Sequence, residues 1–358
     1  MPVGLAAATD PEAEAAAQAA LAAGGGSIDA MIAAFFASAG HDAGSLLGPV
    51  VALVAGVGMS PRWVDGRGLQ PGLGIRRPRG LVDGQAVPDV AYAAVPRSIA
   101  ALALLHAYGA RLPLGALVRR GIALAEQQGA LRRAATLDAI GHRGAGAART
   151  ADLQRAVLQC AGLAAGGLIT EADLQHATPA EAPAQVVVLA ADLALALPTD
   201  LPPKALSRGA LGPRSAGRRA QFAVAADGRG AVAAIAYCPD PDGPRVEELE
   251  LRLARDAVPV RRGISRVTPG TPRASAAPIA VLSRATQGWF AALGIEGTAS
   301  VEPLPATSPT PQALRDLLEL FVVQAGGESA VAASAQRRKT ALTRVGRARR
   351  DDQSPGTL

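Results

Sequence analysis

Residues 215–237 read SAGRRAQFAVAADGRGAVAAIAY. Two apolar runs, QFAVAA and AVAAIAY, flank the turn sequence DGRG, and this pattern predicts a β-hairpin. An abrupt strand start after a loop rich in glycine and arginine is where some hydrolases place a nucleophile. From Ala216 to Ile264, however, there is no serine or threonine, and Cys238 supplies the only thiol. The sequence therefore predicts the hairpin and gives it no hydroxyl nucleophile.

The length and composition are those of a large, aromatic-poor globular protein. The chain has 358 residues, of which 49% are hydrophobic and 3% aromatic, so its core must consist mainly of Ala, Val and Leu. Its 36 basic residues outnumber 30 acidic ones and include two lysines, Lys204 and Lys339. Arginines spread along the whole chain in this way indicate a GC-rich bias of the coding sequence rather than a dedicated surface for a polyanion. Cys160 and Cys238 have no metal-binding spacing.

The N-terminus lacks the basic region of a signal peptide, and no long apolar run predicts a membrane span. We therefore expect a cytoplasmic protein with no membrane partner. Basic residues gather between positions 337 and 350, which is typical of a nucleic-acid-binding tail. Because no aromatic residue is interleaved with them for base stacking, the sequence favours a solvated end and no nucleic-acid partner.

Apolar periodicity predicts the elements on both sides of the hairpin. Ile28, Met31, Ile32, Phe35 and Phe36 follow the i, i+3, i+4 spacing of a buried helix face. Helices are predicted at 10–23, 28–39, 97–108, 114–128, 131–140, 150–164 and 310–324, with a short one after Thr170, and strands at 50–58, 91–96, 186–190, 193–197 and 278–282. This order of helices and strands predicts a layered α+β fold.

Four stretches between residues 10 and 180 resemble the γ-glutamyltransferase family, whose members have the N-terminal-nucleophile hydrolase fold. They are AALAAGGGSIDAMIAAFFASAGHDAG (19–44), WVDGRGLQP (63–71), AVPRSIAALALLHAYGARLPLGALVRRGIALAEQQG (94–129) and GGLITEADLQHATP (166–179). The matching positions are Gly25, Gly26, Asp29, Ala30, His41, Gly44, Gly48, Asp65, Arg67, Pro71, Val95, Pro96, Tyr108, Gly109, Leu124, Ala125, Glu126, Gly129, Gly166, Gly167, Ile169, Thr170, Asp173 and Leu174.

The resemblance implies an α+β fold, the four-layer αββα sandwich of N-terminal-nucleophile hydrolases. The fold is expected in a trimmed form, because few residues separate Pro202 and Pro203 from the hairpin. It implies a large-subunit-like region at 1–203, a shortened linker at 204–218, a small-subunit-like region at 219–345 and a basic, polar tail at 346–358.

The resemblance also implies where the nucleophile would lie. The family's small subunit begins Thr-Thr-His before a strand, and the alignment puts Arg219, Ala220 and Gln221 there. A guanidinium has no nucleophilic atom and stays protonated. We therefore expect a chain that does not self-cleave and is catalytically degenerate. The alternative is an active γ-glutamyl hydrolase or transferase with a displaced nucleophile, for which Ser215 is the nearest candidate.

Ligand-binding residues follow from the same resemblance. Arg67 corresponds to the arginine that binds the α-carboxylate of the γ-glutamyl group; the other interpretation is an ordinary surface arginine. Ser275, in PGTPRASAAP, corresponds to a serine that contacts the same carboxylate. Gly297 and Thr298, in GIEGT, correspond to the oxyanion hole, with threonine at a glycine position.

No cofactor and no metal are expected, because the cysteines have no metal-binding spacing and the four histidines show no HExxH or HxH spacing. The expected partner is a γ-glutamyl or amino-acid-like small molecule. A homo-oligomer, a hetero-oligomer with an active relative, and a pseudoenzyme without any selected role all stay open.

Overall fold

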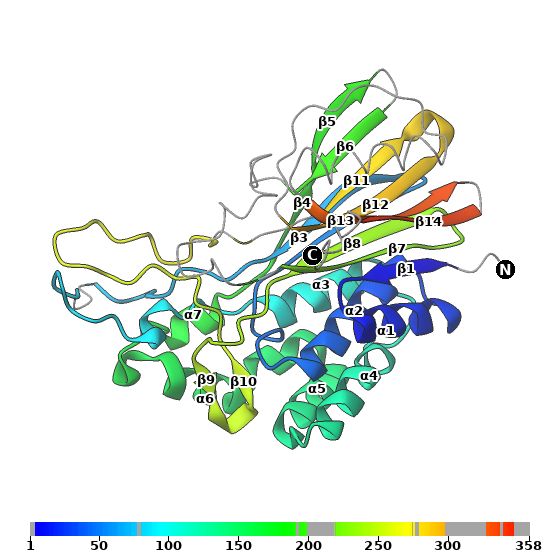
Figure 1. Ribbon diagram of the computed structural model, residues 1–358. Coiled ribbons are helices and arrows are strands. Elements are labelled where there is room, and N and C mark those ends of the chain that lie inside the picture. Colours follow the sequence, from blue (N-terminus) through cyan, green and yellow to red (C-terminus); the bar gives the residue numbers. More distant parts are fainter. Residues whose placement is uncertain are drawn as a thin grey trace, which may run out of the picture.

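The computed structural model shows a layer of helices beneath one β-sheet and a second β-sheet stacked on the other face of the first (Figure 1). The structure describes residues 4–76, 80–190, 193–198, 218, 220–273, 275, 279–297, 327–336 and 339–346. None of the helices in these ranges is long and apolar enough to cross a membrane.

The first sheet is fully antiparallel and is built around the predicted hairpin. Its strand order is β1 (Leu5–Ala8), β7 (Gln221–Ala226), β8 (Ala231–Tyr237), β2 (Val50–Gly56), β3 (Met59–Gly66) and β4 (Ala180–Pro183). The predicted strands QFAVAA and AVAAIAY are β7 and β8, so the hairpin prediction is confirmed. Gly230 closes the turn with a φ of 91°, a conformation that favours glycine.

The second sheet is also antiparallel and combines strands from both halves of the chain. Its order is β14 (Lys339–Gly346), β13 (Gly327–Gln336), β12 (Trp289–Gly297), β11 (Ile279–Arg284), β6 (Leu193–Leu197) and β5 (Gln185–Ala190). Phe222 and Val281 pack between the sheets. Leu195, Leu282 and Leu293 lie outside that inter-sheet cluster and are also buried, so both faces of this sheet are buried, as a four-layer αββα sandwich requires.

Seven helices are described, and they cover the outer face of the first sheet (Figure 1). Helix α2 is buried along nearly its whole length, and the ring of its Phe35 lies 5.3 Å from that of Tyr237 in β8. The helices are α1 (Pro11–Ala22), α2 (Ser27–His41), α3 (Ser98–Gly109), α4 (Leu114–Gln127), α5 (Leu131–Arg143), α6 (Ala151–Ala161) and α7 (Glu171–Gln175).

Some sequence predictions are wrong or incomplete. The strand predicted at 91–96 is instead the end of a 3-10 helix, Asp89–Tyr92, followed by a single bridge between Val95 and Leu69. Pro88 and Pro96 flank this run and lack the N–H groups that a ladder needs. The helix predicted at 150–164 ends at Ala161, because Gly162 is extended.

Six of the longer strands were not predicted as strands: β1, β3, β4, β12, β13 and β14. The two-residue strands β9 (Arg245–Val246) and β10 (Leu251–Arg252), which pair with each other, were not predicted either. Part of the basic stretch expected to be a solvated end is the edge strand β14, where Arg344 pairs with Glu14 of α1 at 2.5 Å. The short alternating runs in these segments are rich in alanine and give a weak strand signal. The helix predicted at 310–324 lies outside the described residues.

Helices α2 and α4 cross in close contact at two glycines, Gly40 of α2 and Gly121 of α4. A Cβ added at Gly121 would lie 2.1 Å from the carbonyl oxygen of Phe36. We expect Gly121→Ala to lower the free energy of unfolding by about 1–3 kcal/mol because the helices must separate. In α4, Gly115 is exposed, and a Cβ there would lie 3.6 Å from the carbonyl oxygen of Gly141, an ordinary contact distance, so Gly115→Ala should raise that free energy by up to about 1 kcal/mol.

Urea unfolding of the two variants checks this pair of predictions. Equal effects of the two substitutions would contradict the close helix crossing.

Candidate functional site

The predicted site residues that the structure describes lie at one end of the sandwich. Cross-strand pairing aligns Gly66 of β3 with Val50, Val50 with Tyr237, and Tyr237 with Gln221 at the start of β7. With neighbouring strands about 4.8 Å apart, Gly66 and Gln221 are about 14 Å apart. Arg67 therefore leaves the sheet at the end where β7 begins. Arg219, the expected nucleophile position, lies outside the described residues; in the sequence it is two positions before Gln221.

The second sheet brings two further predicted segments to the same end. A Cβ at Gly294 of β12 would lie 2.1 Å from the ring of Phe222, so β12 crosses β7 directly at that point. From there β12 continues to Gly297 at its end. Ser275 precedes β11, whose first residue, Ile279, pairs with Gly294. Thr298, the other residue predicted for an oxyanion hole, lies outside the described residues.

Arg67 is buried and engaged by its own chain. Its Nε and Nη2 donate to the two carboxylate oxygens of Asp65, each at 3.0 Å, and its guanidinium lies 5.5 Å from the Trp63 ring centroid. Arg97 lies 3.1 Å from Asp65 and donates to the carbonyl of Arg67. Burial favours a higher pKa of Asp65, but hydrogen bonds from Arg67 and the charges of both arginines hold it below its ordinary value. A ligand carboxylate would therefore share Arg67 with an ionised Asp65.

Backbone pairing brings the segment of Ser275 against that of Arg67. The N–H of Arg273 donates to the carbonyl of Gly68 at 2.8 Å, and that of Gln70 donates to the carbonyl of Thr271 at 2.9 Å. Ser275 is buried at the end of this paired segment. The two residues predicted to bind a carboxylate thus lie on segments that the fold holds together.

The loop after Arg67 is anchored by a motif that carried the resemblance. The Asp173 carboxylate accepts hydrogen bonds from the N–H groups of Gly72 and Leu73, at 2.8 and 3.0 Å. The Thr170 hydroxyl donates to the carbonyl of Leu73 at 3.0 Å. Thr170 and Asp173 also form the capping box of α7, so this motif fixes a loop rather than contributing reactive groups.

A buried arginine holds the segment that enters β7. The Arg218 side chain is 4% exposed and lies 2.7 Å from a carboxylate oxygen of Asp256. It also donates to the carbonyls of Cys238 and Pro239, at 2.6 and 3.2 Å, and lies 3.6 Å from Asp240. These contacts fix the backbone immediately before β7 against the segment that follows β8.

Further charged groups extend this cluster. Arg255 donates two side-chain hydrogen bonds to Asp240, at 2.9 and 3.0 Å. Burial favours a higher pKa of Asp240, but the Arg255 hydrogen bonds and the Arg218 charge hold it below its ordinary value. Burial raises the pKa of Asp256, and Arg218 opposes that rise. Arg273 donates to the carbonyl of Asp256 at 3.0 Å, which joins the cluster to the loop beside Arg67.

Neither of two reactive groups near β7 is placed to act as a nucleophile. Cys238 is 1% exposed, and burial raises its pKa to about 11, so the thiol is protonated at neutral pH. The Thr9 hydroxyl accepts a hydrogen bond from the N–H of Phe222 at 3.2 Å, so it is engaged with the backbone of β7. Ser215, the candidate for a displaced nucleophile, lies outside the described residues.

Sequence reasoning missed Arg97, Arg218 and Asp256. Arg218 and Asp256 are 38 positions apart, and their pairing depends on the path of the whole hairpin. In a chain with 36 basic residues, no local pattern separates a buried arginine from an exposed one.

Comparison with solved structures shows the fold. Cephalosporin acylase from Bacillus halodurans is 14% identical over 96% of each chain, with a TM-score of 0.69. A γ-glutamyltranspeptidase from Pseudomonas nitroreducens is 18% identical over 59% of this chain and 75% of its own, with a TM-score of 0.50. No protein-family model and no curated protein sequence matches. The chain has the α+β sandwich fold of N-terminal-nucleophile hydrolases.

Breaking the Arg218 cluster should destabilise the protein. Arg218→Met leaves the Asp256 carboxylate buried without its ion-pair partner, so we expect a loss of about 3–5 kcal/mol in the free energy of unfolding. The double variant Arg218→Met/Asp256→Leu should recover most of that loss. Arg155→Met, which removes an exposed ion pair with Asp152, should change it by less than about 1 kcal/mol.

Urea unfolding of these variants checks the cluster's role. A loss in Arg218→Met no larger than in Arg155→Met would show that the cluster does not hold the hairpin.

The Cys238 thiol should be inert in the folded protein because it is buried and has a raised pKa. In a Cys160→Ala background, we expect a disulfide reagent at pH 8 to label Cys238 only after unfolding in guanidinium. In the Cys238→Ala variant, the same reagent measures labelling of the half-buried Cys160 alone. Rapid labelling of Cys238 without denaturant would mean that the thiol is accessible and reactive.

Proposed function

We propose that this chain is a γ-glutamyltransferase-like protein that does not self-cleave, does not catalyse amide chemistry, and binds a γ-glutamyl or amino-acid-like ligand. The observation that carries the proposal is the start of β7. In N-terminal-nucleophile chemistry this is where a hydroxyl or thiol with a free α-amine is required. The sequence there has Arg219, and no serine or threonine occurs between positions 216 and 264.

The Arg218 cluster supports the loss of self-cleavage. An N–O acyl shift requires the nucleophile's side chain to reach the preceding carbonyl, so the chain around that bond must be able to distort. Here the residue before the expected nucleophile is fixed by an ion pair with Asp256 and two hydrogen bonds to carbonyls. Cys238, the thiol beside this cluster, is protonated and enclosed.

The placement of Arg67 and Ser275 supports ligand binding. Both are at the end of the sandwich where β7 begins, and their segments are paired through Arg273 and Gly68. A guanidinium and a hydroxyl suit the α-carboxylate of an amino acid. Since Asp65 already accepts two hydrogen bonds from Arg67, we propose that the ligand is bound weakly, with its amino group near Asp65.

Amide turnover tests the catalytic half of the proposal. With γ-glutamyl-p-nitroanilide, and with a cephalosporin as a second amide, we expect no product above the buffer control at any pH between 6 and 9. A linear release of product proportional to protein concentration would contradict this. It would favour the alternative, an active γ-glutamyl hydrolase or transferase with a displaced nucleophile such as Ser215.

Calorimetric titration with glutamate tests the binding half. We expect saturable binding that Arg67→Lys weakens about tenfold or more, because lysine lacks the planar guanidinium that bonds a carboxylate through two nitrogens. Ser275→Ala should weaken it less. Arg119→Lys, at an exposed position of α4, should leave it unchanged.

Melting temperatures of the variants show whether each is folded. If folded wild type takes up no glutamate at millimolar concentration, the ligand half fails. A purely structural role, such as partner of an active relative, would then replace it.

A further inference from the structure

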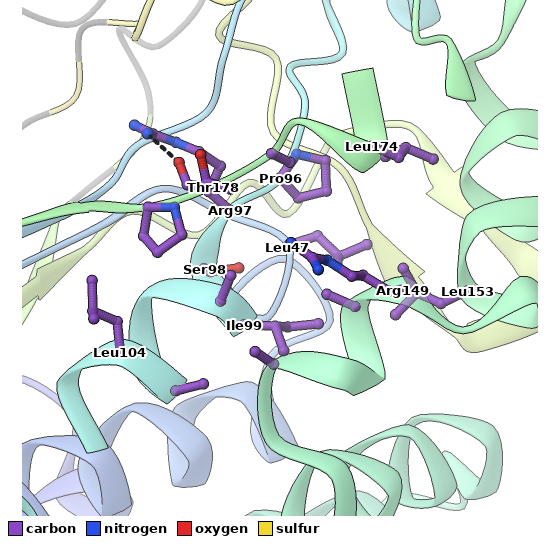
Figure 2. A pocket seen from close by; sticks show the side chains of 16 residues that line it. Leu47, Pro96, Arg97, Ser98, Ile99, Leu104, Arg149, Leu153, Leu174 and Thr178 are labelled. Carbon is purple, nitrogen blue, oxygen red and sulfur yellow. Dashed lines mark hydrogen bonds between the residues drawn. The ribbon is translucent and has the colours of Figure 1, made fainter. Parts of the chain in front are cut away.

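A cavity of about 300 Å³ lies within the helix layer, beyond Arg97 from the candidate site (Figure 2). The start of α3, the 3-10 helix η2 (Gly144–Arg149) and the segment after α7 enclose it. Its walls are mostly aliphatic: Leu47, Pro96, Ile99, Leu104, Leu153 and Leu174 line it together with several alanines. An apolar cavity of this size is at the lower end of the range that small-molecule sites occupy.

Arg97 lies between the cavity and the candidate site, but its guanidinium is already bonded within the protein and is not available to a ligand in the cavity. Its guanidinium donates to the carbonyl of Thr178 at 3.0 Å (Figure 2). It also donates to the carbonyl of Arg67 at 2.6 Å and lies 3.1 Å from Asp65. The Ser98 hydroxyl donates to the carbonyl of Leu46. These polar groups are committed to the fold, so they do not define what the cavity binds.

Arg149 is the charged group of the lining that the fold leaves available. It is exposed, and its side chain reaches from the end of η2 toward Leu47 and the interior of the cavity (Figure 2). Among the described residues, nothing forms an ion pair or hydrogen bond with its side chain. The lining contains no acidic residue, so the charge of Arg149 is not compensated inside the cavity.

We propose that this cavity binds a small amphipathic monocarboxylate. Its carboxylate pairs with Arg149, and its apolar body lies against Leu47, Ile99 and Leu104. At about 30 Å³ for each heavy atom, the volume that a water occupies in the liquid, the cavity holds about ten non-hydrogen atoms. An eight-carbon fatty acid has this size. A single available cation and aliphatic walls favour one negative charge over a phosphate or a dicarboxylate.

Calorimetric titration with octanoate tests the proposal on the full chain. We expect saturable binding of octanoate and much weaker binding of both octan-1-ol, which lacks the charge, and acetate, which lacks the apolar body. Arg149→Met should weaken octanoate about tenfold or more. Arg143→Met, a nearby exposed arginine that does not line this cavity, should leave the affinity unchanged.

A second variant fills the cavity without touching the charge. Ala103 of α3 lines the cavity and is half-buried, so Ala103→Leu adds three carbons to the space and should abolish octanoate binding. Octanoate that binds equally well to Ala103→Leu and Arg149→Met would be adsorbed elsewhere on the surface, which overturns the proposal. Absence of saturable binding to wild type at millimolar octanoate would overturn it as well. Neither result depends on glutamate or amide turnover.

Discussion

The buried ion pair between Arg218 and Asp256 is the interaction on which the candidate site depends. It fixes the backbone that enters β7, and Arg273 and Asp240 connect it to the loops on either side. In a reactive relative of this fold, the same place must tolerate a broken chain and a free amine. Here it is a desolvated charge cluster, and removing one partner from such a cluster is costly. The local physics therefore favours a continuous chain.

The motifs that resemble γ-glutamyltransferases predict the fold well because most of their residues have structural roles. Asp29 accepts hydrogen bonds from the N–H groups of Gly26 and Leu112, and Asp173 does the same for Gly72 and Leu73. The hairpin could be predicted to the residue, since its alternation and turn are local. Residue propensities alone favour a strand at 91–96 and could not exclude it. Its flanking prolines prevent it instead, because they lack the N–H groups that pairing with a neighbouring strand needs. The buried charge cluster could not be predicted, because its partners meet only in the folded chain.

Arg97 lies between two regions of different chemistry. On one side, Asp65 and Arg67 form a buried charged group at the end of the first sheet. On the other, an aliphatic cavity lies in the helix layer, and Arg149 is among the residues that line it. Arg97 lines the cavity and also donates to the carbonyl of Arg67, so the two regions share this residue.

The central claim is that the chain stays in one piece, and intact-mass spectrometry tests it most directly. The purified protein, without a tag, is kept at neutral pH for several days and then weighed. The account predicts one species with the full mass of 36.0 kDa. Two fragments, the second beginning with serine, threonine or cysteine, would contradict it and identify the nucleophile.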